Sequence, residues 1–408
     1  MMRGCGPPID PLVIRVGRGR WPAIFAFLIA LAGAPGLALA APPAPVENQV
    51  SQLDTSRQQC ISTAAAVQRR ENSIGALDLA IKVMERGIET KKKEIALRRD
   101  EQEALLGALE RLARAPPEAL ALAREGPVDR QRSAILIGAA VPALAAQALQ
   151  LSGQLAALTA AQRQVETRRQ DVDDARAALA KSREQLAQLV TRRNALIAQL
   201  LHDDNKTVPA DPIGDQATDL VDLIKKADAA TEQRDKDLLV RLRVLYGAAV
   251  KGSTPPDPTK PKNLRALDAP RLDMIWPVAG ELTHRFGEAD RYGRPSQGLS
   301  LQAAPGALVV APFDGRVDYV GPFRGYGLIL IIRHGGGYHS LLAGLGHVDV
   351  TTGQWLLAGE PVGSLAEADE NSAGATLYFE LRREERPVDP QSRLASRDQK
   401  TEDTRVRE

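Results

Sequence analysis

Residues 304–345 decide the fold of the C-terminal part of the chain and read APGALVVAPFDGRVDYVGPFRGYGLILIIRHGGGYHSLLAGL. Short apolar runs alternate there with glycine-containing turn signals, and residues 374–382, GATLYFELR, add another run of the same kind. Apolar runs spaced by about 8–12 residues and separated by turns are typical of an antiparallel all-β fold. We therefore predict an all-β domain over residues 273–393.

The run at residues 374–382 predicts a strand with two different faces. Because residues i and i+2 of a strand point to the same side, Thr376, Tyr378 and Glu380 share one face, and Leu377 and Phe379 share the other. The apolar face is suited to a core. The other face is polar, so any functional groove of this strand is expected on that side.

Several motifs give the β-rich part a family likeness. They are Ala311-Pro-x-Asp-Gly-x-Val317, Gly325-Tyr-Gly327, Ile331-x-x-His-Gly335 and Val350-x-x-Gly-Gln354. In these motifs the domain resembles the lysostaphin/LytM-type zinc metallopeptidases. The resemblance implies a zinc ion held by a His, an Asp four residues later and the second His of a His-x-His strand, with two further histidines that assist the water.

None of the five implied positions keeps the residue that the family uses. They are occupied here by Ser296, Ser300, Gly344, Thr376 and Tyr378. Thr and neutral Tyr are poor zinc ligands, and without an ion no bound water reaches a pKa near 7. We therefore predict no catalytic residue, no metal and no cofactor in a degenerate peptidase domain.

The other histidines of the domain are His284, His334, His339 and His347. We expect His334 to cap a turn and the His347-Val-Asp349 pair to lie in a loop. A metal site rebuilt from these residues is disfavoured, because it requires a new ligand geometry.

The N-terminal segment predicts export. Arg15, Arg18 and Arg20 precede a short apolar run, and Ala38-Leu39-Ala40 offers small residues before a cleavage point. We predict a signal peptide over residues 1–40, cleaved near Ala40, and a periplasmic protein; an uncleaved membrane anchor is the alternative. The formal net charge of +2 gives no support to a nucleic-acid partner.

The residues after this segment carry a helical pattern. Apolar residues recur every seven positions from Leu53 through Cys60 and Val67 to Ile95, with a second series interleaved at three and four residues. Lys91 and Arg98 interrupt the seam, which ends at Ala115-Pro-Pro117.

A second seam runs from Leu151 to about Leu201. We predict an antiparallel coiled-coil hairpin over residues 41–205, with arms roughly 90 Å long at 1.5 Å per residue, although parallel self-dimers would use the same seam. Between the arms, residues 115–150 are predicted as a tip lobe of short helical pieces broken at Gly126-Pro127 and Pro142; this lobe is either a docking site or a small self-packed cap.

Three further segments complete the chain. Residues 206–250 are predicted to be helical, with Leu220, Leu223, Ile224 and Ala227 on one face; this segment is either a restraining arm over the groove or a permanent brace. Residues 251–272 read as a Pro/Lys-rich linker, and residues 394–408 as a charged tail.

An exported coiled coil followed by a degenerate LytM-type domain resembles the EnvC family of murein hydrolase activators. That resemblance implies a non-catalytic activator of periplasmic N-acetylmuramoyl-L-alanine amidases in septal cell-wall splitting, coupled to the FtsE–FtsX division complex through the coiled coil. The alternatives are a structural or peptidoglycan-binding scaffold and an active zinc endopeptidase. The groove residues expected to contact the amidase are Tyr326, Tyr378, Arg382, Gln297, Arg324 and Arg383.

Overall fold

The computed structural model describes residues 44–113, 127–201, 213–245, 257–267, 274–289, 293–367, 374–384 and 386–395. The predicted signal peptide, most of the predicted charged tail and the chain between the two long helices lie outside these residues. No helix of the described part is long and apolar enough to cross a membrane.

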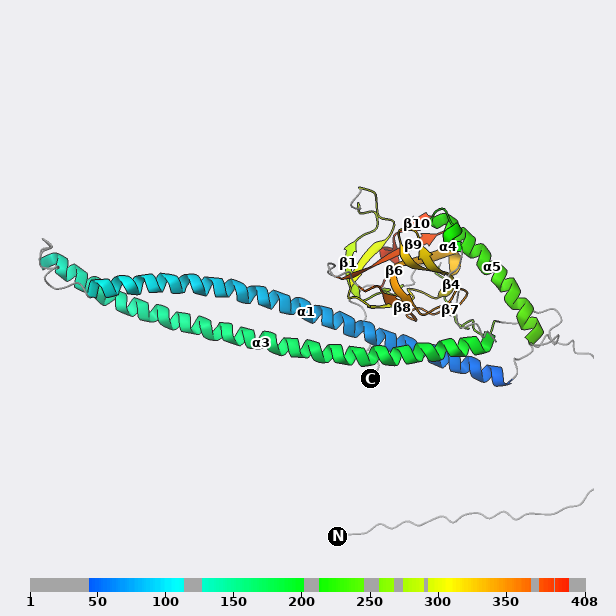
Figure 1. Cartoon of the computed structure of the whole chain (residues 1–408), viewed down its shortest axis with the longest axis horizontal. Coiled ribbons are helices and arrows are strands. Elements are labelled where there is room, and N and C mark those ends of the chain that lie inside the picture. Colours follow the sequence, from blue (N-terminus) through cyan, green and yellow to red (C-terminus); the bar gives the residue numbers. More distant parts are fainter. Residues whose placement is uncertain are drawn as a thin grey trace, which may run out of the picture. The chain divides into compact units, whose positions relative to one another are not determined.

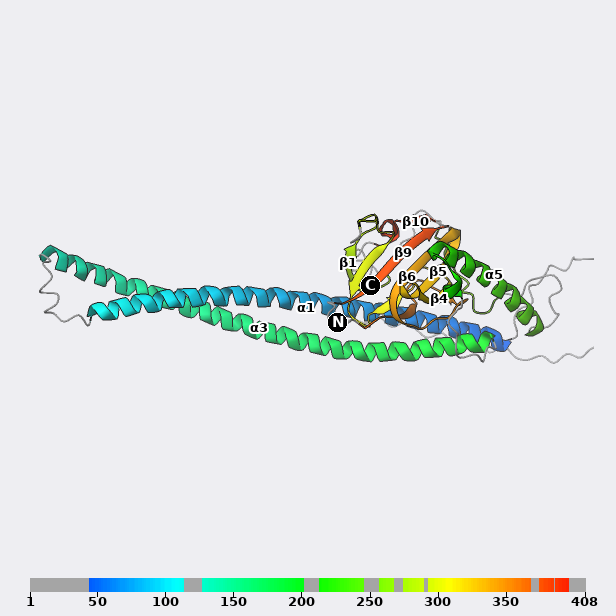
Figure 2. The same cartoon turned by 45° about the horizontal axis from the view of Figure 1, so that its top comes forward.

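Two long helices form an antiparallel hairpin. Helix α1 spans Ala44–Ala113 and helix α3 spans Pro127–Leu201, and they lie side by side in both views (Figures 1 and 2). The residues expected at the seam are buried between them, including Leu53, Cys60 and Val67 of α1. The predicted coiled coil and its seam are therefore confirmed.

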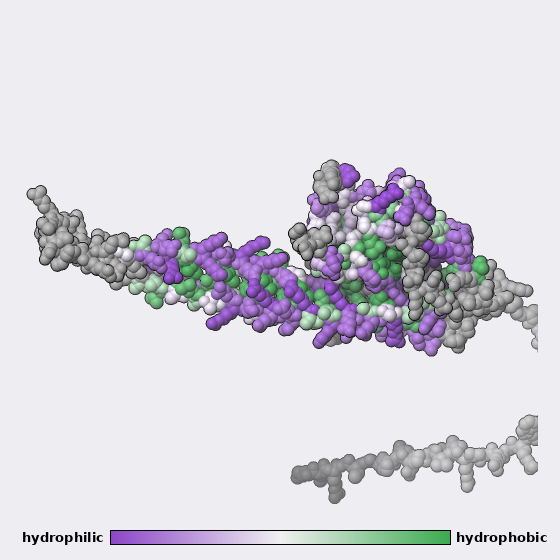
Figure 3. Space-filling model, viewed as in Figure 1, coloured by the Kyte–Doolittle hydropathy of each residue, from purple (hydrophilic) through white to green (hydrophobic). Residues whose placement is uncertain are grey.

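A ladder of ion pairs fixes the relative direction of the two helices. Arg183 pairs with Glu71 at 2.7 Å, Arg176 with Asp78 at 3.1 Å, and Arg169 with Glu85 at 2.6 Å. As the partner on α1 advances by seven residues, the partner on α3 retreats by seven, so the pairing within this chain is antiparallel. Hydrophilic residues cover most of the face of the hairpin drawn in Figure 3.

Pro142 does not interrupt α3. The helix continues through it from Pro127 to Leu201, so the predicted break at this residue is wrong. Proline lacks only the N–H donor of its own position and clashes with the preceding turn, a cost of about 3 kcal/mol that a long helix can absorb. Residues 127–150 of the predicted tip lobe form the first part of α3 instead of short helical pieces, and residues 115–126 lie outside the described residues.

The C-terminal part is an antiparallel sheet, as predicted. Its strands are β1 (Gly280–His284), β2 (Leu299–Ala303), β3 (Leu308–Val310), β4 (Gly315–Phe323), β5 (Gly327–Arg333), β6 (Tyr338–Val348), β7 (Trp355–Leu356), β8 (Pro361–Leu365), β9 (Ala375–Arg383) and β10 (Arg386–Val388). Their order in the sheet is β1-β2-β9-β6-β5-β4-β7, with β10 beside β9 and β8 between β3 and β6. Two short 3₁₀ helices, η1 (Gly335–Gly337) and η2 (Pro390–Arg393), complete the domain.

The two faces of the central strands pack against different partners. Leu377, Phe379 and Leu381 of β9 enter the main core of the β domain. On the opposite face, Ile329 and Ile331 of β5 belong to a second apolar cluster. A helix covers that second face.

The covering element is the segment predicted as a restraining arm. It contains α4 (Ile213–Gln216) and α5 (Leu220–Leu245), and α5 lies beside β4 (Figures 1 and 2). The predicted apolar face of α5 is confirmed, because Leu223 and Ala227 are fully buried against the sheet together with Leu220 and Ile224.

The base of the hairpin also contacts the β domain. Arg193 of α3 donates to the carbonyl oxygen of Pro361 at 3.2 Å, and Arg57 of α1 donates to that of Thr259 at 2.8 Å. Around these polar contacts, Cys60, Val67 and Val190 form an apolar cluster with residues of β3. Hairpin and β domain therefore share a packed interface.

Part of the segment predicted as a linker belongs to the packed domain. Leu267 is fully buried in the main core, and Arg265 pairs with the carboxylate of Asp314 at 2.9 Å. Proline and lysine composition predicted an extended tether here. The described residues 257–267 instead lie along the β domain, so the ordered domain begins before residue 273.

His334 has a structural role different from the predicted one. It precedes η1 without a side-chain capping bond; its Nδ1 lies 2.8 Å from the carbonyl oxygen of Asp314 and its Nε2 2.8 Å from Oγ of Ser340. A carbonyl can only accept, so Nδ1 carries the proton and Nε2 accepts from the serine hydroxyl. Burial lowers the pKa of this ring from 6.5 to about 4.

The pKa shift of His334 predicts a loss of stability on acidification. Above pH 6.5 the ring is neutral in both states, whereas between pH 6.5 and 4 the unfolded chain takes up a proton that the folded chain refuses. The free energy of unfolding should fall over this interval by up to about 3 kcal/mol more in the wild type than in a His334→Gln variant. Urea unfolding of both chains at pH 7, 5.5 and 4.5 measures the difference; parallel pH profiles would contradict it.

Candidate functional site

The polar face of β9 has the predicted alternation. Thr376 is exposed, Tyr378 is half-buried and Glu380 is buried on one face, while Leu377 and Phe379 are buried in the core on the other. The strand therefore keeps the two-sided pattern that the fold requires. Its polar face is the place to look for a site.

Four of the five degenerate positions lie close together on this face. Ser300 of β2 is the Cα partner of Tyr378 on β9, and a Cβ added at Gly344 of β6 would meet the backbone of Thr376. Ser296 lies in the loop before β2, where its hydroxyl donates to the carbonyl oxygen of Gly298 at 2.9 Å. The fold thus assembles these positions, with hydroxyl and glycine residues where the resemblance implies metal ligands and a catalytic histidine.

Gly344 cannot be replaced by histidine without a change in the backbone. Its φ is +91°, and a Cβ at this position would lie 2.3 Å from the carbonyl oxygen of Thr376. Gly344 also lies where the pairing of β6 with β5 shifts by one residue. The local conformation is therefore one that only glycine adopts at low cost.

Three side chains of β9 form a hydrogen-bonded row. The hydroxyl of Tyr378 donates to Oε2 of Glu380 at 2.9 Å, and Arg382 lies 2.5 Å from Oε1 of the same carboxylate. Burial raises the pKa of Tyr378, and the Glu380 carboxylate adds to the effect, so the tyrosine stays a neutral phenol. The row fixes the tyrosine ring at the edge of the covered face.

The predicted partner contacts differ in exposure. Tyr326 is 37% exposed, and its ring centroid lies 6.1 Å from that of Tyr378, so the two tyrosines are brought together. Gln297, Arg324 and Arg383 are also exposed. Arg382, expected at the groove edge, is instead only 4% exposed. It pairs with the buried carboxylate of Glu380 and borders a cavity under α5.

Helix α5 covers the part of this face next to Tyr378. Leu341 and Ala343 of β6 pack under α5, and they are the Cα partners of Glu380 and Tyr378. Tyr378 itself is partly buried against the same cluster. The apolar floor beside the two tyrosines is therefore occupied by residues of the same chain.

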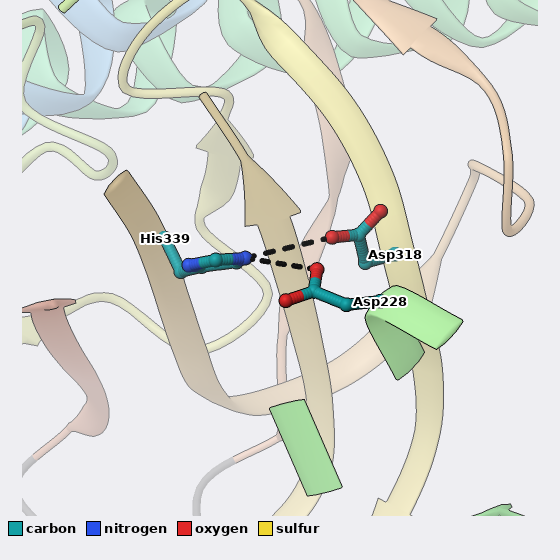
Figure 4. A group of neighbouring side chains, drawn as sticks. All are labelled: Asp228, Asp318 and His339. Atoms are coloured by element: carbon teal, nitrogen blue, oxygen red, sulfur yellow. Dashed lines mark hydrogen bonds and ion pairs between the residues drawn. The ribbon is translucent and has the colours of Figure 1, made fainter. Parts of the chain in front are cut away.

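A second group of side chains lies under α5. Asp228 of α5, Asp318 of β4 and His339 of β6 point toward one another (Figure 4), and His339 Nε2 lies 3.1 Å from Asp228 Oδ1 and 3.7 Å from Asp318 Oδ2. Among the described residues, only this group brings three metal-ligating side chains together. Burial raises the pKa of Asp318 to about 7, and the neighbouring Asp228 carboxylate adds to the rise.

Sequence reasoning missed this group. His339 enters the sequence analysis only as one of the histidines of the β domain, and Asp228 lies in the helical segment, 111 residues from His339 in the chain. One signal was present. Asp228 directly follows Ala227 on the face predicted to be buried, and a carboxylate at the border of an apolar helix face requires a partner.

Comparisons with known proteins cover the β domain. Residues 294–390 match the model of Peptidase family M23. The chain is 34% identical over 148 residues to a protein of Escherichia coli (strain K12) called murein hydrolase activator EnvC, covering 35% of each chain. It is 30% identical over 133 residues to murein hydrolase activator NlpD of Salmonella dublin, covering 32% of this chain and 34% of that protein.

Among solved structures, Helicobacter pylori Csd3 is 22% identical, with a TM-score of 0.27, over 31% of this chain and 36% of that one. The chain thus matches about a third of the length of these curated relatives, 35% and 34%. The matched family region, residues 294–390, overlaps the antiparallel sheet and contains the five positions that the resemblance maps to zinc ligands and catalytic histidines. The C-terminal β domain of this chain thus contains a region, residues 294–390, that matches Peptidase family M23.

Proposed function

We propose that the chain is a murein hydrolase activator that works through its M23 domain without a metal at the family's usual place. The observation that carries this proposal is the polar face of β9. The strand keeps the alternation that the fold requires. The five positions that the resemblance assigns to zinc ligands and catalytic histidines, on this face and beside it, hold Ser296, Ser300, Gly344, Thr376 and Tyr378. Two relatives of this chain are called murein hydrolase activators, which supports the same class of function here.

The partner that we propose is a periplasmic N-acetylmuramoyl-L-alanine amidase. The tyrosine pair at the edge of the face, exposed Tyr326 beside half-buried Tyr378, supports a protein contact, because tyrosine and arginine are enriched among residues that dominate binding energy. Arg324 and Gln297 are exposed and extend the same proposed surface. Direct contact with peptidoglycan is a further part of the proposal.

Helix α5 is proposed to hold this surface in a resting state. It buries Leu223 and Ile224 on the face that contains Tyr378, and release of the helix would expose an apolar floor of β5 and β6. An apolar floor of this kind is a suitable binding site for a helix or loop of another protein. The coiled-coil hairpin is proposed to carry the signal for release from the FtsE–FtsX complex, in the periplasm.

A peptidoglycan-release assay tests the proposed function. The chain covering residues 42–408 is incubated with labelled peptidoglycan, with an amidase alone, and with both, each with and without a chelator. We expect no release by the chain alone. We expect the amidase to release more peptidoglycan when the chain is present and its helix α5 has been displaced by the substitution Leu223→Asp than when the amidase acts alone. Chelator-sensitive release by the chain alone would establish an endopeptidase instead, and no effect on several amidases from a chain with displaced α5 would favour a scaffold.

Tyr326→Ala should weaken amidase binding about 10-fold, because truncating a central tyrosine of an interface typically costs 1–2 kcal/mol. The residue is 37% exposed, so the fold should be unaffected. Binding to immobilised amidase, measured in a chain with displaced α5, provides the affinity. Lys262→Ala, an exposed residue of the segment before the sheet, is the matched control and should bind like the parent chain. Equal affinities of the two variants would remove Tyr326 from the proposed interface.

A further inference from the structure

The group Asp228, Asp318 and His339 joins three elements that are far apart in the sequence. Helix α5 supplies one carboxylate, β4 supplies the other, and β6 supplies the imidazole, whose Nε2 end faces both carboxylates (Figure 4). One ligand atom from each residue lies within 4.8 Å of the other two. The group therefore links the covering helix to the sheet.

The spacing of these atoms suits a small divalent ion. Zinc bonds of about 2.0–2.2 Å to nitrogen and oxygen, arranged tetrahedrally, place neighbouring ligand atoms about 3.3–3.6 Å apart. The distances from His339 Nε2 are 3.1 Å to Asp228 Oδ1 and 3.7 Å to Asp318 Oδ2, on either side of that value. The two carboxylate ligand atoms lie within 4.8 Å of each other, so side-chain rotation of the carboxylates is needed to place all three atoms at bonding distance of one ion.

Asp318 supplies a second, independent observation. Its side chain is 1% exposed, yet neither carboxylate oxygen accepts a hydrogen bond from any described residue. Unsatisfied buried polar atoms are uncommon, and a bound ion is one of their ordinary explanations. Arg333, with Nε 3.2 Å from Asp318 Oδ2 and 4.0 Å from Asp228 Oδ1, supplies one positive charge against two carboxylates.

An access route leads to the group. A cavity of about 290 Å³ is bounded by Val221 and Asp228 of α5 on one side and by His339 and Arg382 of the sheet on the other. Both Asp228 and His339 thus border a space that can admit a hydrated ion. A plausible metal site requires such a route in addition to its ligands.

We propose that Asp228, Asp318 and His339 bind one divalent transition-metal ion of the zinc type, and that this ion ties α5 to the sheet. One imidazole and two carboxylates are a ligand set that zinc accepts, with a fourth position left for water. The site is separate from the degenerate M23 positions. His339 of β6 pairs with Arg382 of β9, whereas Tyr378 of β9 pairs with Ala343, which lies farther along β6. From the sequence we predicted no metal, because ligands were sought within the β domain alone. Asp228, the ligand from α5, lies outside that domain.

Metal binding is tested on the chain covering residues 42–408, after treatment with a chelator and desalting. Zn²⁺ is titrated by calorimetry, retained metal is counted by mass spectrometry, and Co²⁺ is added as a spectroscopic probe of coordination. We expect one ion per chain in the wild type. Asp228→Asn should lower the affinity about 100-fold or more, since even residues that only support a metal ligand are typically worth 10–100-fold. A wild type that retains no Zn²⁺ at micromolar concentration, or an Asp228→Asn chain that binds as tightly, would overturn the site.

Two matched controls accompany this test. Asp237→Asn changes an exposed carboxylate on the same helix, and His347→Gln removes the exposed histidine that lies 3.1 Å from Asp349. Both variants should retain one Zn²⁺ per chain. Loss of binding in His347→Gln would move the site to that surface pair and would contradict the assignment to His339.

Hydrogen exchange tests the tie between the ion and α5. Added Zn²⁺ should slow exchange of the α5 amides in the wild type and leave them unchanged in Asp228→Asn, with each chain serving as its own metal-free reference. If Zn²⁺ binds but α5 exchange does not change, the ion does not hold the helix. Neither measurement uses an amidase, so the metal site stands or fails independently of the proposed activator function.

Discussion

The Arg57→Met chain should lose about 3 kcal/mol of unfolding free energy, the lower end of the cost of breaking a buried ion pair, because Glu360 keeps Arg193 as its other positive neighbour. Arg57 of α1 is 1% exposed, and its Nε lies 3.4 Å from Oε1 of Glu360, which is fully buried in the β domain. Methionine keeps the apolar part of the side chain and removes only the charge and its donors. Urea unfolding of the chain covering residues 42–408 measures the loss.

A double variant separates the loss of the ion pair from a packing defect. Arg57→Met combined with Glu360→Gln removes both charges and retains an oxygen for the backbone N–H of Leu357, which now donates to Glu360 at 3.1 Å. Most of the lost stability should return. Arg69→Met, an exposed arginine of the same helix, should change stability by less than about 0.5 kcal/mol. A double variant as unstable as the single one would show that the charge of Glu360 is not the cause.

Leu223→Asp should displace α5 from the sheet. Leu223 is fully buried in the cluster between α5 and strands β4, β5 and β6, and a carboxylate at this position would have no partner there. The cost of burying it, several kcal/mol, exceeds what the remaining apolar contacts of one helix can readily offset. Limited proteolysis should cut α5 at least 10-fold faster than in the wild type, and under the proposed function the variant should activate the amidase without its upstream signal.

The same helix offers a matched control for this variant. Val240 is 60% exposed, so Val240→Asp introduces the same charge on α5 without burying it. It should resemble the wild type in proteolysis and in the amidase assay. Faster proteolysis of Leu223→Asp without any gain in amidase activity would separate the covering helix from regulation and would leave α5 as a permanent brace.

Local patterns were sufficient to predict the seam of the hairpin and the two faces of β9. The seven-residue repeat from Leu53 to Ile81 identified the buried seam of α1, because a helix that repeats apolar residues at this period must bury one stripe. The alternation at Leu377 and Phe379 identified the core face of β9 for the analogous reason. Both are properties of a short window of sequence.

Contacts between elements were not predictable in this way. Arg57 and Arg193 occur in long, charged helices where an arginine is ordinarily solvated, yet 1% and 0% of these residues is exposed because the β domain lies against them. Arg382 lies two residues after Glu380 on β9, so the alternation of the strand places it on the face of Tyr378. Its burial depends on α5 and on Glu380, and no property of residues 374–382 alone reports the helix.

The charge ladder of the hairpin does not by itself select one alignment of the two helices. If α3 slipped by one heptad, about 10 Å at 1.5 Å per residue, Arg183 would face Asp78 and Arg176 would face Glu85, again as opposite charges, and of the three arginines only Arg169 would lose its partner and face Lys92. The apolar seam has the same period and is equally degenerate. The contacts of Arg57 and Arg193 with the β domain distinguish the observed alignment from the shifted one. If the base of the hairpin separated from the β domain, α3 could therefore slide along α1 to a second alignment one heptad away.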